Sequence, residues 1–289
     1  MCKSGPHRRP AVRSSTTNFR STERMRTVIA YSPVLLEPQP GQVAIRWLGQ
    51  GGFAFRSPNG TTWVVDPYLS DFGRNGRAKR LVGPPVDPST IFCDAILCTH
   101  AHSDHADPES LAAIAKASPD ARLIGRDASI AVGVEAGIAS RRLQAVSVGD
   151  RRVPIRGLRQ PSTDVYVDVV YADHSGDACG YVFSVGDGPR PFRLYVTGDT
   201  LYHPDLVSDA TRDVDLLCVC INGRWGNMGA VEAATLASKL GVPRVVPMHF
   251  GVMVDNDADP EAFLEALRAN AVVTEPKVLA IGESWLVGY

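Results

Sequence analysis

Short runs of apolar and β-branched residues predict strands at the start of the globular part of the chain. The runs are VAIRWL at 43–48, GFAFRS at 52–57 and TTWVVD at 61–66. Each has the length of a strand, and the turn-forming triplets GQG and PNG separate them. This spacing predicts a meander of three antiparallel strands joined by tight turns.

Apolar runs that alternate with helix-periodic segments follow the meander. Residues 95–100 (AILCTH) begin with a continuous apolar run, which is typical of a strand buried on both faces. At 108–118 the apolar residues recur with helical spacing, and the proline at its start suits a first helical turn. We also predict a strand at 122–125 and a helix at 127–137, capped by Asp127 and closed by Gly137.

The second half of the chain repeats this order of strands followed by βα units. Predicted strands lie at 143–148, 152–157, 165–173, 180–185, 192–199, 214–221 and 244–249. Predicted helices lie at 229–241 and 260–270, and apolar segments at 278–282 and 284–288 close the chain. Because the order occurs twice, we predict an α+β fold over residues 41–289, an αββα sandwich of two mixed β-sheets flanked by helices.

Residues 1–40 lack such periodicity and are rich in Ser, Thr, Arg and Pro. They hold seven Lys or Arg residues against two acidic residues, so we expect a disordered basic tail. Met25 offers a second start site, and the Arg- and Ser-rich composition also fits a mitochondrial transit peptide. A second irregular segment, rich in Gly, Pro and Arg, is expected to form a long loop at 70–90.

The charge and apolar content of the body exclude several functional classes. The formal net charge is −1, and the residues after the tail hold 23 basic and 29 acidic side chains. This balance disfavours nucleic acid as a partner, because phosphate binding needs a basic face. No apolar run is long enough to span a membrane, so we expect no membrane partner. The six scattered cysteines are interpreted as small core residues of a cytoplasmic protein.

The segment THAHSDHAD at 99–107 holds the strongest chemical signal. His100 and His102 are two residues apart at a predicted strand end, where both side chains can face one side. Asp104 and His105 follow in a turn. Imidazole and carboxylate ligands suit Zn²⁺, Mn²⁺ or Fe²⁺. A cluster of surface histidines is the structural alternative.

These residues resemble the metallo-β-lactamase superfamily, whose signature HxHxDH matches HAHSDH. The remaining signature positions follow in order at His174, Asp199 and His249. The resemblance implies two divalent metal ions per chain, Zn²⁺ or Mn²⁺. It assigns one ion to His100, His102 and His174, the other to Asp104, His105 and His249, and makes Asp199 the bridge between them.

The resemblance also implies the reaction type and the supporting residues. Members of the superfamily are hydrolases in which the metal pair activates a hydroxide, and Asp104 is the catalytic candidate that steers it and protonates the leaving group. Ligating histidines usually donate their second N–H to a neighbour. Asp66 and Asp107 are candidates for that role, and Thr200 for hydrogen bonding to a ligand.

Several segments narrow the resemblance to the ascorbate-6-phosphate lactonase-like branch: RWLGQGGF at 46–53, GDTLYH at 198–203 and RVVPMHF at 244–250. The branch implies the hydrolysis of an ester or lactone, such as a phosphorylated sugar lactone. An anionic substrate needs positive charge or N–H groups. Asn222, Arg224 and His203 are therefore the substrate-binding candidates.

Other functions remain open at this stage. A phosphodiesterase for lipid or nucleotide diesters uses the same metal pair, and it would need an apolar groove or a base-stacking pocket. The acidic body disfavours an RNA-processing nuclease, and a redox member usually has a flavin domain, for which no sequence is left. A non-catalytic metal-binding sensor would keep the fold without turnover. We expect a small anionic substrate as the partner and leave a homo-oligomer open.

Overall fold

The computed structural model describes residues 1, 35–71, 80–270 and 273–288. Its contacts divide the chain into Met1–Tyr31 and Ser32–Tyr289, and all elements described below belong to the second unit. Residues 2–34, on which most of the predicted basic tail falls, lie outside the described residues. The same holds for 72–79 in the predicted long loop. The described part of that loop includes a short 3-10 helix at Pro88–Thr90.

The first sheet has the strand order β14-β1-β2-β3-β4-β5-β6. The strands β14, β1, β2 and β3 pair antiparallel, as the predicted meander requires, whereas β3, β4, β5 and β6 pair parallel. Their bounds are β1 Gln42–Gly49, β2 Gly52–Arg56, β3 Thr62–Val65, β4 Ala95–Cys98, β5 Arg122–Gly125, β6 Leu143–Ala145 and β14 Ser284–Gly288.

The second sheet repeats this plan with the order β13-β12-β11-β10-β9-β8-β7. Here β7, β8, β9 and β10 pair antiparallel, and β10, β11, β12 and β13 pair parallel. The bounds are β7 Val153–Pro154, β8 Val165–Val170, β9 Gly180–Val185, β10 Phe192–Val196, β11 Leu216–Cys220, β12 Arg244–Met248 and β13 Glu275–Pro276. The two-fold repeat seen in the sequence is therefore real.

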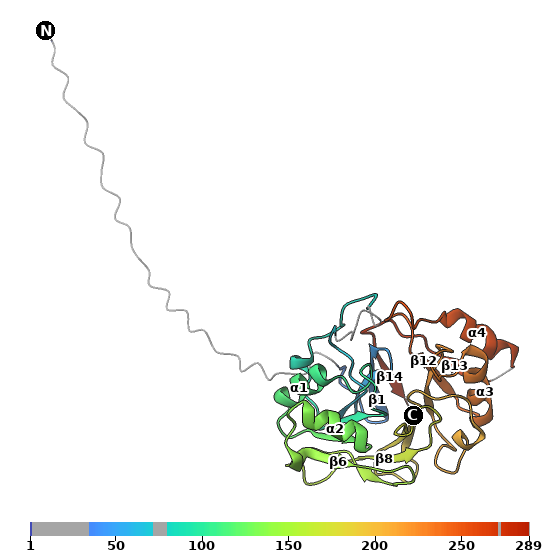
Figure 1. Ribbon diagram of the computed structural model, residues 1–289, viewed down its shortest axis with the longest axis horizontal. Coiled ribbons are helices and arrows are strands. Elements are labelled where there is room, and N and C mark those ends of the chain that lie inside the picture. Colours follow the sequence, from blue (N-terminus) through green and yellow to red (C-terminus); the bar gives the residue numbers. More distant parts are fainter. Residues whose placement is uncertain (2–34, 72–79, 271–272, 289) are drawn as a thin grey trace. The chain divides into compact units, whose positions relative to one another are not determined.

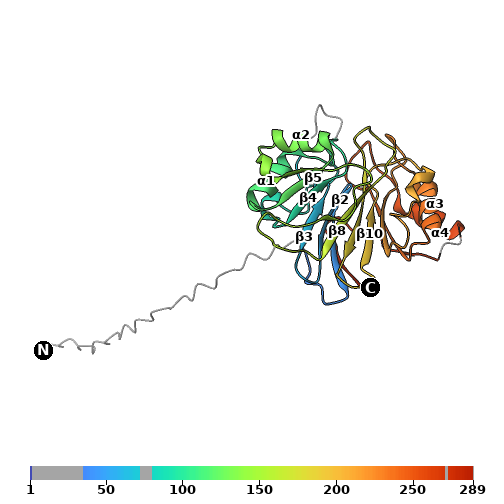
Figure 2. The same ribbon diagram turned by 90° about the horizontal axis from the view of Figure 1, so that it is seen from below.

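In the described part of the chain, four α-helices flank the two sheets on their outer sides (Figures 1 and 2). Helices α1 and α2 accompany the first sheet, and α3 and α4 accompany the second. Their bounds are α1 Pro108–Ala117, α2 Asp127–Glu135, α3 Ala230–Leu240 and α4 Pro260–Ala269. The predicted αββα sandwich is confirmed.

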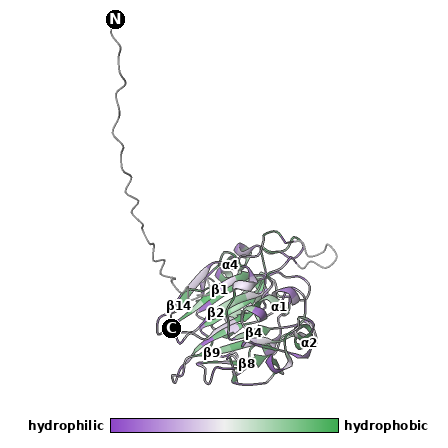
Figure 3. Cartoon of the chain, turned by 90° about the vertical axis from the view of Figure 1, so that its left-hand side faces the viewer, coloured by the Kyte–Doolittle hydropathy of each residue, from purple (hydrophilic) through white to green (hydrophobic). Residues whose placement is uncertain are grey.

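Aromatic side chains join the two sheets in a common core. Trp63 and Phe55 of the first sheet lie 5.4 Å and 6.0 Å from Phe183 of the second, measured between ring centroids. A separate apolar cluster fills the space between the first sheet and its helices. Hydrophobic colour accordingly concentrates on the strands in Figure 3. The core shared by the two sheets holds their strand ends next to one another.

Some predicted details were wrong. Asp127 is the first residue of α2 and not its cap, because Arg126 holds the N-cap position. That helix ends at Glu135, two residues before Gly137. Helix α3 ends at Leu240, and Gly241 is its C-cap with a φ of 61°, a left-handed conformation that glycine tolerates best. The apolar segment 278–282 forms turn and coil.

Among the described residues, the cysteines are free thiols and no helix could span a membrane, as the sequence predicted. Cys98, Cys179, Cys218 and Cys220 are buried, and with half-buried Cys93 all are free thiols. Burial raises the pKa of Cys93, Cys179 and Cys220 to about 12. These thiols act as small core residues. Within the described ranges, no helix has the length and apolar content needed to cross a membrane.

Candidate metal centre

The predicted ligands follow the carboxyl ends of four strands. His100 and His102 lie in the loop after β4, His174 follows β8, Asp199 follows β10 and His249 follows β12. Strands β8, β10 and β12 run in the same direction, so their carboxyl ends meet at one edge of the second sheet.

The loop after β4 is tied to this edge by backbone contacts. The amide of Cys179 donates to the carbonyl of Thr99 over 3.0 Å, and the hydroxyl of Tyr181 donates to the carbonyl of Cys98 over 2.7 Å. Residues far apart in the sequence therefore form a single centre.

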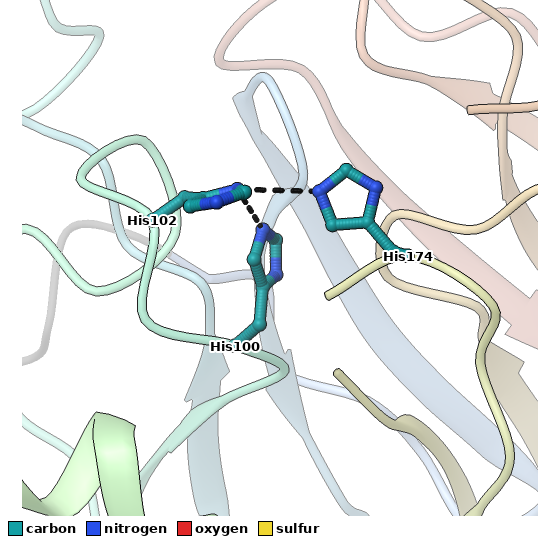
Figure 4. Close-up of side chains that lie close together, drawn as sticks. All are labelled: His100, His102 and His174. Atoms are coloured by element: carbon teal, nitrogen blue, oxygen red, sulfur yellow. Dashed lines mark hydrogen bonds between the residues drawn. The ribbon is translucent and has the colours of Figure 1, made fainter. Parts of the chain in front are cut away.

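Three histidine nitrogens converge at the first part of the centre (Figure 4). The Nδ1 atom of His102 lies 2.9 Å from Nε2 of His100 and 3.2 Å from Nε2 of His174. Nitrogens bound to one tetrahedral ion at about 2.0–2.1 Å lie roughly 3.3 Å apart. The spacing thus suits a shared metal ion.

Asp104, His105 and His249 form the second part. The Oδ2 atom of Asp104 lies 3.7 Å from Nε2 of His105 and 3.6 Å from Nε2 of His249. Asp199 lies between the two parts: its Oδ2 is 3.3 Å from Nε2 of His105 and 3.9 Å from Nε2 of His174. Its Oδ1 is 3.2 Å from Nε2 of His249. All seven predicted ligands lie within this centre, and Asp199 has the position of a bridge.

Two buried atoms of the centre lack a hydrogen-bond partner among the described residues, namely Nε2 of His105 and Oδ1 of Asp199. The latter is within ion-pair distance of His249 but makes no hydrogen bond with it. Unpaired polar atoms are costly inside a protein. A lone pair on an imidazole nitrogen and a carboxylate oxygen are donors that a divalent ion accepts, so the donor set fits a metal site.

Asp66 holds the other side of the His105 ring. Its Oδ2 lies 2.8 Å from Nδ1 of His105, and it accepts the hydroxyl of Thr99 over 2.7 Å. Because that hydroxyl donates to Asp66, it accepts from His100, whose Nδ1 lies 3.1 Å away. His174 has a similar support, since its Nδ1 lies 3.0 Å from the carbonyl oxygen of Gly226. These contacts turn the opposite nitrogens toward the centre.

Asp107 and Thr200 have other hydrogen-bond partners than the metal ligands for which they were predicted. The carboxylate of Asp107 accepts from the amide of Glu109 and the hydroxyl of Ser110, so it caps α1 instead of orienting a histidine. The hydroxyl of Thr200 accepts the amide of Asp173 over 2.9 Å, which fixes the backbone next to His174. Thr200 thus supports the centre through the main chain.

A cavity of about 590 Å³ opens over the centre. The described residues that line it are His102, Ser103, Asp104, His174, Asp199, Arg224, Trp225, Met253, Asp255 and Asn256. Of the three predicted substrate-binding residues, this set contains only Arg224.

The other two substrate-binding candidates have structural contacts. The side-chain amide of Asn222 donates to Asn256 over 2.7 Å and accepts from Asn227 over 3.0 Å, so it links its own loop to the loop after β12. His203 caps the 3-10 helix Pro204–Leu206, and its ring lies 5.2 Å from that of Tyr171 with the two planes tilted by 59°. Neither residue lines the cavity, and a substrate-binding role for them stays a prediction.

Gln50, in the turn between β1 and β2, is a site residue that the sequence reading missed. Its side-chain nitrogen donates to Oδ2 of Asp104 over 3.0 Å and lies 3.4 Å from the ring of His249. The neighbouring Gly51 packs against His105, because a Cβ atom there would lie 2.7 Å from its ring carbon. The only signal was a glutamine inside the glycine-rich triplet, which a turn alone explains.

Charge interactions outweigh burial in the second part of the centre. Burial by itself would raise the pKa of Asp199, but His105 and His249 hold it well below its usual range. Burial would lower the pKa of His249, yet Asp199 and Asp104 raise it to about 9. Without metal, His249 therefore holds a proton at neutral pH.

The first part of the centre behaves in the opposite way. Burial, followed by the charge of His105, lowers the pKa of His100 well below its usual value. Burial and the neighbouring His174 lower the pKa of His102. These imidazoles are neutral at physiological pH and offer their lone pairs without first losing a proton.

The comparison with known families agrees with this geometry. A sequence profile described as the beta-lactamase superfamily domain matches residues 44–249, more than half of the chain. The chain belongs to the β-lactamase superfamily. Its ligand loop and all four strand ends that form the centre fall inside the matched segment.

Relatives of this β-lactamase superfamily protein are named metal-dependent hydrolases. One from Thermodesulfovibrio yellowstonii is 26% identical over 257 residues, covering 84% of this chain and 92% of the relative. Another, from Myxococcus xanthus, is 30% identical over 247 residues, covering 82% of each chain. The protein is therefore a metal-dependent hydrolase of the superfamily.

Solved structures share the fold of this β-lactamase superfamily member. A metallo hydrolase from Ignicoccus hospitalis has a TM-score of 0.64 at 19% identity, covering 86% of this chain and 99% of the other. An isothiocyanate hydrolase from Delia radicum gut bacteria has a TM-score of 0.66 at 17% identity, covering 85% and 99%. At these identities the likeness establishes the fold alone.

Proposed function

We propose that this hydrolase cleaves an ester bond, preferentially that of a lactone, in a small anionic substrate. The observation that supports the proposal most is the position of the centre. Seven ligand side chains, two with unpaired buried atoms, lie at the base of a cavity of about 590 Å³. A substrate of the size of a sugar lactone fits such a volume.

Two divalent ions, Zn²⁺ or Mn²⁺, would be held as the resemblance implies, one by His100, His102 and His174, the other by Asp104, His105 and His249, with Asp199 shared. When bound, such a pair polarises the substrate's oxygen and makes water a nucleophile near neutral pH. The chain's own residues orient this site, since Asp66, Thr99 and Gly226 contact the rings from behind.

Asp104 is the proposed acid–base residue. Its carboxylate lines the cavity and is held by Gln50, so it can accept a proton from the attacking water and pass it to the leaving oxygen. Its pKa lies below the usual range, because His105 and His249 outweigh the effect of burial. The group is therefore ionised in the resting protein.

Arg224 supports the anionic character of the substrate. Arg224 lines the same cavity from the loop that follows β11, and its guanidinium donates to the carbonyl of Asp255 over 3.4 Å. Arginine binds carboxylate and phosphate groups through paired hydrogen bonds. A phosphorylated sugar lactone would place its reacting carbonyl at the centre and its anionic group toward Arg224.

The proposal is tested by an activity panel of lactones, carboxylic esters and phosphodiesters, assayed with added Mn²⁺ or Zn²⁺. We expect lactone opening that depends on the added metal and is lost in Asp199→Ala. We also expect Arg224→Ala to raise KM for anionic lactones more than for neutral ones. Failure to open any lactone or ester, together with turnover of another class, would overturn the proposal.

A phosphodiesterase is the second candidate, and one observation favours it. Trp225 and Met253 give the cavity an apolar wall, which a lipid or nucleotide diester would need. Cleavage of diesters alone in the same panel would assign this function. Full metal content without turnover of any class would instead support a sensor.

The buried free thiols also fit a reducing cytoplasm, which we propose as the location. Small-molecule partners and a homo-oligomer remain predictions.

A further inference from the structure

Trp225 is exposed in a way that the fold does not explain. Its side chain is 73% exposed, whereas Trp47 and Trp63 are fully buried in the core. An indole left in water contributes little to folding, since its stabilising effect comes from burial. Trp225 nevertheless lines the cavity above the metal centre, next to Arg224.

The backbone at Trp225 adopts a conformation that disfavours this residue. Its φ is 56° and that of Gly226 is 86°, and the amide of Asn227 donates to the carbonyl of Arg224 over 3.2 Å. Positive φ at both central positions of such a turn favours Asn, Asp or Gly at the place that Trp225 holds. Backbone strain of this kind is concentrated at functional sites.

The turn is held rigidly against the centre. The carbonyl of Gly226 lies 3.0 Å from Nδ1 of His174, and the side chain of Asn227 donates to Asn222. The amide of Met228 donates to the carbonyl of Thr200 over 2.8 Å. The indole therefore stands on a fixed support beside a proposed metal ligand, which is the preorganisation that a binding subsite needs.

Apolar side chains complete this side of the cavity. Met253, from the loop after β12, lines it together with Trp225. A thioether and an indole both make favourable contacts with an aromatic ring.

We propose that Trp225 and Met253 form a subsite for an aromatic ring, so that the enzyme prefers substrates with a planar aromatic group close to the scissile ester bond. The inference rests on the proposed ester hydrolysis and names its substrate class. Arg224 lies beside the ring and binds an anionic group on the same substrate. Trp225 is thus a specificity-determining residue, separate from the groups that carry out hydrolysis.

The test compares an aromatic and an aliphatic lactone, 3,4-dihydrocoumarin and δ-valerolactone, in the wild type, Trp225→Gly and Trp225→Phe. In Trp225→Gly we expect the ratio of kcat/KM for dihydrocoumarin to that for valerolactone to fall about tenfold, with much of the ratio restored in Trp225→Phe. Metal content should not change. Glycine suits the positive φ, so the melting temperature should not fall.

Val134→Ala is the matched control, because Val134 is 60% exposed but lies on α2. In Val134→Ala, the ratio of kcat/KM for dihydrocoumarin to that for valerolactone should equal the wild-type ratio. An unchanged ratio in Trp225→Gly, with normal metal content, would overturn the proposal.

A binding measurement keeps the subsite testable if neither lactone is hydrolysed, an outcome that contradicts the proposed ester function. The probe is phenylacetate, added to the metal-loaded protein while tryptophan emission is recorded. We expect the emission to shift to shorter wavelength as the exposed indole is covered, and the shift to vanish in Trp225→Phe. No shift in the wild type, or the same shift in the variant, would contradict the aromatic subsite.

Discussion

At the scale of single residues, the centre depends on which ring nitrogen of each histidine keeps its lone pair. Asp66 contacts Nδ1 of His105, and the carbonyl of Gly226 contacts Nδ1 of His174. A neutral imidazole carries one proton, so each contact places it on Nδ1 and leaves Nε2 available. Residues that bind no metal themselves therefore influence metal affinity.

Asp66→Asn tests this influence. The amide is a poorer acceptor for the His105 N–H, so we expect metal affinity to fall about 10- to 100-fold. Calorimetric titration of the metal-free protein with Mn²⁺ or Zn²⁺ measures the change. Asp107→Asn is the control, since it makes the same change at the cap of α1. Asparagine caps a helix about as well as aspartate, so this variant should keep both the stability and the metal affinity of the wild type. Wild-type affinity in Asp66→Asn would contradict the assigned role.

Proton release on metal binding follows from the charge of His249. Its pKa of about 9 lies above neutral pH, so the metal-free protein is protonated at this side chain at pH 7. A metal must displace that proton, whereas at a pH above about 9 the proton has already left. Metal affinity should thus rise with pH through this range, and His105 adds to the rise, because Asp199, Asp104 and Asp66 raise its pKa against the effect of burial. Titrations in buffers of different ionisation enthalpy should show fewer protons released above pH 9 than at pH 7; an equal number would contradict the assignment.

At the scale of elements, turns between strands contribute as much to the centre as the ligand loop does. In the turn between β1 and β2, the side chain of Gln50 donates a hydrogen bond to Asp104, and Gly51 packs against His105. The turn after β11 places Gly226 behind His174. Three of the proposed metal ligands, Asp104, His105 and His174, are therefore contacted by residues of loops that contain no ligand themselves.

Gly51→Ala tests the role of the first turn. The added methyl group would lie 2.7 Å from a ring carbon of His105, so the ring or the turn must move. We expect loss of metal from the second part of the centre and a fall in activity. Gly188→Ala serves as the comparison, because nothing lies within 4 Å of a Cβ atom there. Equal metal content in the two variants would show that the packing of Gly51 against His105 does not affect metal binding.

The sequence predicted those features that local pattern determines. Apolar runs and helical spacing predicted β4 and α1, and the ordered signature placed seven side chains that the fold brings together. Roles that depend on side-chain direction were not predictable. Asp66 and Asp107 looked alike in sequence, yet one faces a histidine and the other caps a helix. Gln50 contacts His249, which is 199 residues away in the sequence, and no local pattern indicates such a contact.

At the scale of the whole molecule, the repeat of strands followed by βα units builds the site. Among the described residues, two α-helices flank each sheet (Figure 2), and β14 from the end of the chain completes the first sheet. The shared aromatic core holds the strand ends of both sheets together. The loop after β4 comes from the first half, and Asp199 and His249 come from the second. Neither half has the complete ligand set, so function depends on their packing.

The metal content of the purified protein, determined by elemental analysis after reconstitution with Mn²⁺ or Zn²⁺, tests this account most directly. We predict about two ions per wild-type chain, and about one in His102→Ala, which removes a ligand from one part of the centre only. A wild-type protein that binds no metal under these conditions, or a His102→Ala variant that binds as much as the wild type, would contradict the two-metal centre.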